Sequence, residues 1–357
     1  MKLCFRWVSL VCVSASLLLS PHAKADAAVA ENKSVEFAPT KTLCIGRLLV
    51  DLPRDAQVSV RGSYHAAELV GVSSASSFAD VERDARVQAE RLGLRASKRQ
   101  DASDDTFDRR AGIDSRQDRS ATRLIGIDSY PKSEQVAIGS HVDDAATKFQ
   151  VDLYRFVDRK RYAFRTINYR ASRYPQARDF LMESAGRYRP LSAGRIPGER
   201  GFCLNDGIFI DSGTPEINES FVLVVKFPKH PGLQFHLDGE ALRKADRDEP
   251  SLARRADREL ATLAEHGDAV RVLKRGEARY ADQGGFEIAI AVNHPDLPGG
   301  GGLKYTWMAE GRVGDVVHPT LEAELMTGQG ASTGLDEAEV AALWKRLMES
   351  LRIRPSG

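Results

Sequence analysis

The order of predicted elements in the first half of the chain is repeated in the second half. Each half begins with an apolar run that contains one cysteine, one glycine and a closing aspartate, residues 43–51 and 202–211. Each half also ends on the pattern Arg-x-Arg-Pro, residues 187–190 and 352–355. Such self-similarity indicates a repeated structural unit, so one topology has to account for both halves.

The strands predicted between these markers also occur twice. A second strand is expected around residues 58–72 of the first half and 221–227 of the second. Further along, apolar and polar residues alternate in residues 149–153, 303–307 and 321–325. This period of two is typical of a strand with one buried face, as in an antiparallel sheet.

Two amphipathic helices are predicted in each half, because apolar residues recur there at helical spacing in residues 77–92, 175–188, 250–266 and 336–351. Ser77 is suited to cap the first helix, and Asp336 with Glu339 has the capping-box pattern. We therefore predict an α+β fold of two similar domains. Each would be an antiparallel sheet packed with two helices, and the two would be related by internal duplication.

The first 25 residues are typical of a secretory signal peptide. Lys2 and Arg6 precede an apolar run at residues 7–19, and the small-x-small sequence Ala23-Lys24-Ala25 follows it. The apolar run is shorter than the roughly 20 residues that a permanent membrane helix needs. We therefore expect residues 1–25 to be removed on export.

The predicted domain boundaries follow from the repeat and from local composition. Residues 26–190 form the expected N-terminal α+β domain and residues 201–357 the C-terminal α+β domain. Residues 191–200 contain two arginines and the turn-forming residues Ser192, Gly194, Pro197 and Gly198, a composition that suits an exposed linker. Relative movement of two domains about such a linker is the default expectation.

Removal of residues 1–25 leaves Cys44 and Cys203 as the cysteines of the mature chain. Export to an oxidising compartment is compatible with a disulfide between them, and two separate buried thiols are the alternative. If the two equivalent cysteines lie near a pseudo-twofold junction, a bridge would tie the two first strands together. In the chain-entropy model, a bridge that closes so long a loop contributes on the order of 5 kcal/mol to the free energy of unfolding.

Composition and motifs argue against several functions. The chain has 51 basic and 50 acidic residues, whereas a nucleic-acid binder normally has a basic excess. Neither the Gly-x-Ser-x-Gly elbow of α/β-hydrolases nor the His-Glu-x-x-His zinc motif occurs in the sequence. Ser140 and His141 adjoin two aspartates, but neighbours in sequence seldom have triad geometry. His230 and His236 flank a turn without a third metal ligand.

Two segments differ from the repeat. Residues 98–119 hold six acids and six bases with almost no large apolar residue, and the matching stretch of the second half is much shorter. Residues 298–304 read Pro-Gly-Gly-Gly-Gly-Leu-Lys, but a strand follows them and not the helix that a phosphate loop requires. Each segment is either a solvated connection or a surface for a partner.

Two sequences carry a resemblance to a known family: Thr-Leu-Cys-Ile-Gly-Arg-Leu-Leu-Val-Asp-Leu-Pro at residues 42–53 and Gly-Phe-Cys-Leu-Asn-Asp-Gly at residues 201–207. They resemble the immunity proteins of type VI secretion lipase effectors, in particular the family paired with the fourth class of phospholipase effectors. The resemblance covers nearly all of the mature chain as an N-terminal and a C-terminal domain.

The resemblance implies a periplasmic protein that is not an enzyme. It would bind and inhibit a cognate phospholipase of α/β-hydrolase fold by occluding the lid or the active-site cleft of that enzyme. The family supplies no catalytic, cofactor or metal residues to transfer, and the expected partner is the effector, with no nucleic acid and no integral membrane segment after signal cleavage. We expect exposed loops to contact the effector, through His294, Asp296, Leu297, Gly299, Gly300, Gly301, Asp104, Asp108 and Arg109.

The main alternative is a periplasmic protein that binds a small molecule or lipid in the cleft between its domains. Against it, the sequence shows no aromatic cluster and no basic pocket signature. A third possible function is that of a hydrolase with an unfamiliar motif. Turnover of an ester or phospholipid by the purified chain would support that one.

Overall fold

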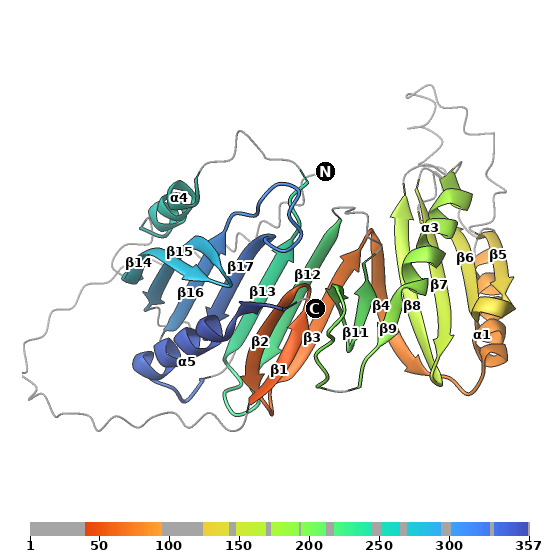
Figure 1. Cartoon of the computed structure of the whole chain (residues 1–357). Helices are drawn as coiled ribbons and strands as arrows, with labels where there is room; N and C mark the ends of the chain where they lie inside the picture. Colours follow the sequence, from red (N-terminus) through yellow and green to blue (C-terminus); the bar gives the residue numbers. More distant parts are fainter. Residues whose placement is uncertain are drawn as a thin grey trace, which may run out of the picture. The chain divides into compact units, whose positions relative to one another are not determined.

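A sheet of twelve strands organises the computed structural model (Figure 1), which describes residues 40–94, 124–142, 148–168, 173–192, 194–211, 218–243, 251–264, 270–293, 301–328 and 332–355. The first half of the chain supplies β3 (Gln57–Tyr64), β4 (Ala67–Ser74), β5 (Leu124–Tyr130), β6 (Gln135–His141), β7 (Phe149–Val157) and β8 (Lys160–Asn168). The second half supplies β12 (Glu219–Lys226), β13 (Gln234–Glu240), β14 (Val270–Tyr280), β15 (Gln283–Val292), β16 (Gly302–Ala309) and β17 (Thr320–Met326).

From the centre of the sheet to either edge, corresponding strands of the two halves follow in the same order. The full order is β14-β15-β16-β17-β13-β12-β3-β4-β8-β7-β6-β5, and neighbouring strands run antiparallel. The central pair joins the two halves, with Glu219 opposite Tyr64 at one end and Lys226 opposite Gln57 at the other. The expected antiparallel α+β character is confirmed. The continuity of one sheet through both halves was not predicted.

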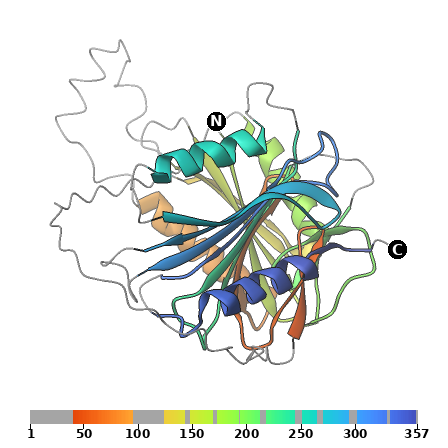
Figure 2. The same cartoon turned by 90° about the vertical axis from the view of Figure 1, so that its left-hand side faces the viewer.

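Four α-helices in the described part of the chain cover the sheet, two on each face. They are α1 (Phe78–Leu94), α3 (Tyr174–Gly186), α4 (Leu252–Ala264) and α5 (Glu337–Ser350), close to the four predicted helices. A short 3-10 helix, η2 (Pro131–Ser133), connects β5 to β6. Both predicted caps are present, since the Asp80 amide donates to the Ser77 hydroxyl and Asp336 forms a capping box with Glu339. Figure 2 shows α4 and α5 on opposite faces of the sheet.

Contacts assign each helix to its face. Helix α1 packs its Val81, Ala85 and Ala89 on Val136 and Ile138 of β6. Helix α4 packs on the same face, where Ala256 meets Phe286, Ile288 and Ile290 of β15. The opposite face carries α3, α5 and the main core, which is continuous across both halves and includes Leu181 of α3, Leu223 of β12 and Trp344 of α5. Alternation along each strand therefore separates two different surfaces of one sheet.

Two small sheets lie in the layer of α3 and α5, and each combines strands from both halves. The hairpin β1 (Thr40–Ile45) and β2 (Leu48–Pro53) is completed by β18 (Arg352–Ile353) from the end of the chain. The hairpin β10 (Gly201–Cys203) and β11 (Gly207–Ile210) is completed by β9 (Tyr188–Pro190) from the first half. The two halves thus exchange hairpins.

Side-chain contacts follow the same exchange. Phe209 of β11 stacks on Tyr64 of the first half at 4.9 Å between ring centroids and meets the edge of Tyr188 at 4.9 Å. In the other direction, the Asp51 amide of β2 donates to the Ser350 hydroxyl at the end of α5, at 3.0 Å. Residues Phe37–Gly357 accordingly form one compact unit.

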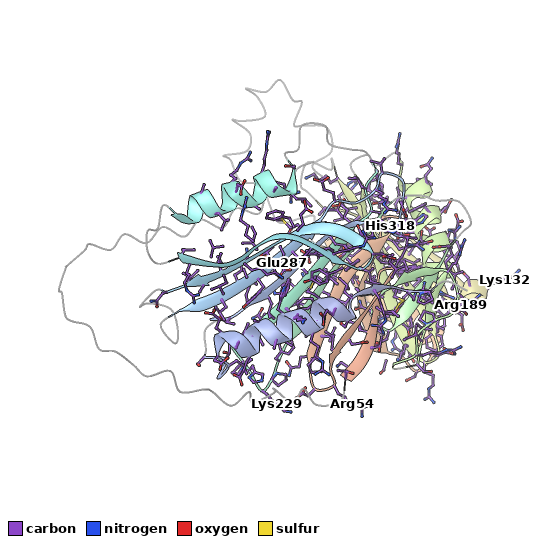
Figure 3. The ribbon with its side chains drawn as sticks, turned by 60° about the vertical axis from the view of Figure 1, so that its left-hand side comes forward. Arg54, Lys132, Arg189, Lys229, Glu287 and His318 are labelled. Atoms are coloured by element: carbon purple, nitrogen blue, oxygen red, sulfur yellow. A yellow bond between two sulfur atoms is a disulfide. The ribbon has the colours of Figure 1, made fainter. Side chains whose placement is uncertain are left out.

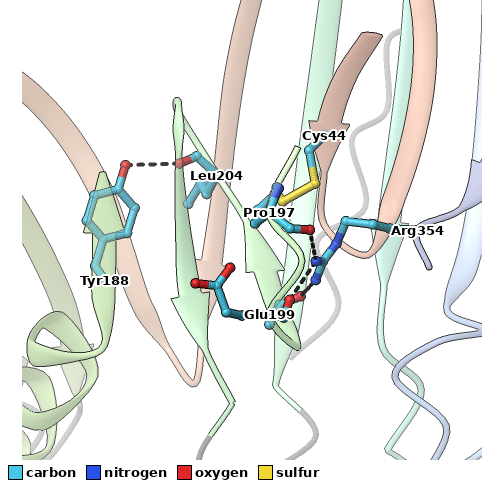
Figure 4. Close-up of a disulfide and its surroundings, with 8 residues drawn as sticks. Cys44, Tyr188, Pro197, Glu199, Leu204 and Arg354 are labelled. Atoms are coloured by element: carbon cyan, nitrogen blue, oxygen red, sulfur yellow. Dashed lines mark hydrogen bonds between the residues drawn. A yellow bond between two sulfur atoms is a disulfide. The ribbon is translucent and has the colours of Figure 1, made fainter. Parts of the chain in front are cut away.

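The end of the predicted linker, residues 191–200, is held by side-chain contacts. The guanidinium of Arg354, which is buried, donates to the carbonyl oxygens of Pro197, Glu199 and Gly201 at 2.9, 2.6 and 2.7 Å (Figure 4). We expected hinge motion at this segment. The end of this segment is attached to Arg354, beside a sheet that runs through both halves, and relative movement of the halves stays a prediction.

Candidate functional site

Most of the residues predicted to contact a partner lie outside the described part of the chain. These are His294, Asp296, Leu297, Gly299 and Gly300 before β16, and Asp104, Asp108 and Arg109 between α1 and β5. Gly301 is described and half-buried, and a Cβ atom there would lie 2.7 Å from the carbonyl oxygen of Val292. A side chain at position 301 would therefore clash with the backbone of β15, which is a structural reason for glycine there. The contact with a partner that we predicted for Gly301 stays a prediction.

Cys44 and Cys203 form the predicted bridge. Cys44 of β1 and Cys203 of β10 are disulfide-bonded, with 5.7 Å between their Cα atoms (Figure 4). Beside them the Gly46 amide donates to the Cys203 carbonyl at 2.9 Å, and the Cys203 amide donates to the Gly46 carbonyl at 2.8 Å. Gly46 has a φ of +57°, and a Cβ atom there would lie 2.7 Å from the Phe221 ring, so glycine suits this turn on both counts.

An ion cluster lies next to the disulfide. Arg47 donates to both oxygens of Glu219 at 2.9 and 2.6 Å and to both oxygens of Asp211 at 2.9 and 2.8 Å. Burial would lower the pKa of Arg47, but the hydrogen bonds and charges of Glu219 and Asp211 outweigh it and raise that pKa. Burial raises the pKa of Glu219 in spite of Arg47. The cluster fixes the first-half hairpin to the start of β12.

A second buried carboxylate lies in the layer between α4 and α5, as Figure 3 shows for Glu287. It accepts hydrogen bonds from the Trp344 indole at 2.9 Å and the Tyr280 hydroxyl at 3.0 Å, and it pairs with Lys274 at 3.0 Å. All three partners belong to the second half, and Glu287 faces the covered side of the sheet. We assign this cluster a structural role, the attachment of α5 to the sheet, because all of these partners lie within the second half of the chain.

The face that carries α1 and α4 is open in its middle. Helix α1 packs over β5, β6 and β7, and α4 packs over β15, so no described helix is packed over the central strands on this side. We call this surface the open sheet face. It presents side chains of β3, β4, β8, β12, β13 and β17, namely Arg61, Ser63, Glu68, Arg165, Ser220, Val222, Val224, His236, Asp238, Glu240, Glu322 and Glu324.

Charge is divided between the two sides of the open sheet face. On the first-half side, Arg165 pairs with the buried Asp152 at 2.8 Å, and Arg61 is exposed without an ion pair to any described residue. On the second-half side, register places Asp238 directly opposite Glu322, and His236 directly opposite Glu324. Lys304 pairs with Glu324 at 2.8 Å. Acids therefore dominate on β13 and β17.

The acidic side raises carboxyl pKa values. Desolvation raises the pKa of Glu322, and the charges of Glu324 and Asp238 raise it further against the opposing effects of Lys304 and Arg255. Desolvation also raises the pKa of Asp238, where His236 lowers it and Glu324 raises it. Like charges directly opposite each other on two strands are destabilising. We regard the exposed surface that carries this pair of acids as a candidate binding surface, because the stability of the fold does not require two acids opposite each other there.

Two hollows open on the surface. One, of about 700 Å³, is lined from both halves, with His65 and Arg173 from the first and Asn218 and Arg243 from the second. The other, of about 340 Å³, is lined by Val72, Lys160, Tyr162, Asn205 and Asp206. Both are open to solvent, and the larger one also has apolar residues in its lining, among them Ile167 and Phe180.

Sequence reasoning did not find the open sheet face, although part of the signal is present. The alternation in residues 321–325 gives Glu322 and Glu324 a common face. It does not reveal that β13 lies beside β17 or which acids come opposite each other, because strand pairing is a long-range choice. In the described part of the chain, no group of three or more His, Cys, Asp or Glu residues is placed to hold a metal ion.

The described helices include none that is both long and apolar enough to cross a membrane. Comparison with known proteins gives a family match in the second half, where residues 195–356 match the family model described as the C-terminal domain of Tle cognate immunity protein 4. No curated protein matches the sequence.

Three solved structures share the fold over most of the chain. The apo structure of immunity protein TplEi of T6SS from Pseudomonas aeruginosa is 19% identical, with a TM-score of 0.68 over 89% of this chain and 98% of that one. The Tle4-Tli4 complex contains a chain that is 19% identical, with a TM-score of 0.69 and the same coverage. TplEi complexed with an "L" peptide is 20% identical, with a TM-score of 0.63 over 89% of this chain and 99% of that one.

Proposed function

We propose that the chain, whose residues 195–356 match the family model for the C-terminal domain of Tle cognate immunity protein 4, binds and inhibits a cognate type VI secretion phospholipase effector. The family match is the observation that carries this proposal. The shared fold over 89% of the chain is compatible with it, since the structure of a relative was solved as a Tle4-Tli4 complex. On this proposal the chain acts by binding and is not an enzyme.

The proposed location is the periplasm. Residues 1–25 have the charged start, apolar run and small-x-small end of a secretory signal peptide. The bridge between Cys44 and Cys203 supports this location, because disulfides persist in oxidising compartments such as the periplasm. The mature chain would therefore start at Asp26.

The proposed mode of inhibition is steric. The partner would be an α/β-hydrolase, and the chain would occlude its lid or its active-site cleft. A rigid sheet shared by both halves supports such a mode, because a preformed surface loses little conformational freedom on binding. The loops at residues 293–302 and 98–119 stay proposed contact segments.

The organisation into residues 26–190, a linker at 191–200 and residues 201–357 also stays a proposal, as does its origin by internal duplication. The identical order of hairpins, helices and strands in the two halves supports a duplication. The exchange of the β1–β2 and β10–β11 hairpins means that two such units would share their layers, so we expect neither to fold without the other.

The experiment that tests the function is a titration of the mature chain, from Asp26 onward, into the type VI phospholipase encoded beside its gene. Binding heat and lipid hydrolysis are measured on the same samples. Stoichiometric inhibition with tight binding is the expected result. Tight binding without inhibition would indicate a chaperone or adaptor, and absence of binding would contradict the pairing. A phospholipase from an unrelated secretion cluster is the control for specificity.

The alternative, a periplasmic protein that binds a small molecule or lipid between its halves, has one observation in its favour. The hollow of about 700 Å³ is lined by both halves and includes Arg173 and Arg243. Its open form is less suited to enclosing a lipid than the deep apolar pockets typical of ligand sites. Thermal stabilisation of the purified chain by lysophospholipid alone would favour this alternative.

A further inference from the structure

We propose that the acidic side of the open sheet face, on β13 and β17, is the docking surface for a cationic segment of the effector. This inference rests on the proposed function and adds the surface and the chemistry of the contact. The occupant is a segment of the partner protein that carries lysine or arginine side chains. Three features of the surface support it: its position, its unbalanced charge and its mixture of polar and apolar groups.

The position of the surface suits a docking segment. Helices α1 and α4 stand on the same face of the sheet, at opposite ends of the strand order. Between them the sheet is exposed enough to leave Val222 40% accessible at its centre. The opposite face has no comparable opening among the described elements, because α3, α5 and the two small sheets cover it.

The register arranges charged and apolar groups in one row across the face. Arg61 of β3 lies opposite Val222 of β12, Val222 lies opposite Asp238 of β13, and Asp238 lies opposite Glu322 of β17. The row thus passes from a base through an exposed apolar residue to two adjacent acids. A mixed row of this kind can orient a partner segment by charge while an apolar contact contributes to affinity.

The acids have little internal neutralisation. The side chains of Asp238, Glu240 and Glu322 make no hydrogen bond or ion pair with another described residue. Lys304 of β16 and Arg255 of α4 lower the pKa of Glu322, but the pKa stays raised. His236 is the neighbour that lowers the pKa of Asp238. A cationic side chain from a partner would offset this repulsion, which supplies part of the binding free energy.

The occupant is a protein segment and not a metal ion, because these acids do not converge. They lie in cross-strand positions on two strands, and no described group of three acid, histidine or cysteine residues could hold a metal. Cationic side chains spaced along a segment match acids spaced along a sheet. The same division of charge, with Arg61 on the far side, sets the direction in which such a segment would bind.

The test compares variants by calorimetric titration with the phospholipase encoded beside the gene. The double variant Asp238→Asn/Glu322→Gln is expected to weaken binding about tenfold or more and to reduce its dependence on salt. The single variant Glu322→Lys is expected to weaken it further, because it places a like charge against the cationic segment. The matched control is Glu183→Gln/Glu349→Gln, which removes two acids from α3 and α5 on the covered side and is expected to bind like the parent chain.

The outcomes separate this inference from the function on which it rests. If the parent chain does not bind the phospholipase, the proposed function fails and the docking surface fails with it. If the parent binds and the double variant binds equally well at low salt, only the docking surface is wrong. Equal binding is also the result expected if another segment of this chain or a second copy already covers the face. Circular dichroism melts of each variant show whether any loss reflects unfolding.

Discussion

Cys44 and Cys203 are 159 positions apart in the chain and are joined by a disulfide, beside the reciprocal backbone hydrogen bonds of Gly46 and Cys203. The bridge therefore connects the two hairpins that the halves exchange. Because it closes so long a loop, it restricts the unfolded chain more than it restricts the native layers.

The double variant Cys44→Ser/Cys203→Ser is expected to lower the free energy of unfolding by about 2–5 kcal/mol. The backbone pairing at Gly46 remains, so the native far-ultraviolet spectrum should be retained at low temperature. Urea unfolding of parent and variant measures the difference. The parent in the presence of a strong reductant is the control and should approach the variant. An unchanged unfolding midpoint in both cases would contradict this role.

Replacement of Arg47 by methionine should destabilise the chain by about 3–5 kcal/mol, because it leaves the charge of Glu219 buried without its cation. The double variant Arg47→Met/Glu219→Gln removes that charge and should recover much of the loss. Equilibrium unfolding of both variants against the parent measures this coupling. Equal stability of the single and double variants would show that the charge of Glu219 is not the cause.

The same variants give a pH dependence with a defined sign. Without Arg47, the pKa of Glu219 in the folded chain lies still further above its usual value near 4.5, so the folded state holds a proton that the unfolded state releases. The stability of Arg47→Met relative to Arg47→Met/Glu219→Gln should therefore rise as the pH falls from 7 toward about 4.5. Unfolding curves across this range measure the difference, and a flat difference would contradict the assignment.

The acids of the open sheet face predict a second pH effect. Asp238 and Glu322 have folded pKa values above their usual 3.8 and 4.5. A raised carboxyl pKa means that the pair destabilises the fold as the pH rises through those values. Asp238→Asn/Glu322→Gln should consequently be at least as stable as the parent at pH 7, and the advantage should shrink at pH 4. Denaturant unfolding at the two pH values measures it, and a less stable variant at pH 7 would contradict the prediction.

Replacement of Arg354 by alanine should free the segment before β10. It removes three hydrogen bonds to the carbonyl oxygens of Pro197, Glu199 and Gly201, with a loss of about 3 kcal/mol. Trypsin should then cleave after Arg195 or Arg200 faster than in the parent, as mass spectrometry can measure. Arg352→Ala is the matched control, because the pair of Arg352 with Asp51 is partly exposed and contributes roughly 1 kcal/mol or less. Equal cleavage in both variants would contradict the anchoring role.

Local features of the chain were predictable because their causes are local. Ser77 and Asp336 cap their helices as predicted, since a cap depends on residues within one turn. The alternation in residues 321–325 predicted a strand with one buried face, and β17 buries Leu321, Ala323 and Leu325 as expected. The sequence left open whether the two cysteines form a disulfide or two separate buried thiols, and the structure contains the disulfide.

What the sequence determined by itself was therefore the four helices, part of the strands and the recurrence of these elements in both halves. Only the tertiary structure decided that β3 pairs with β12, that the halves exchange their hairpins and that Asp238 lies opposite Glu322. The physical reason is that periodicity records which side of a strand is buried, whereas the backbone groups that pair two strands are the same in every residue except proline. The choice of neighbour depends on packing between residues far apart in the chain, and that choice created the open sheet face.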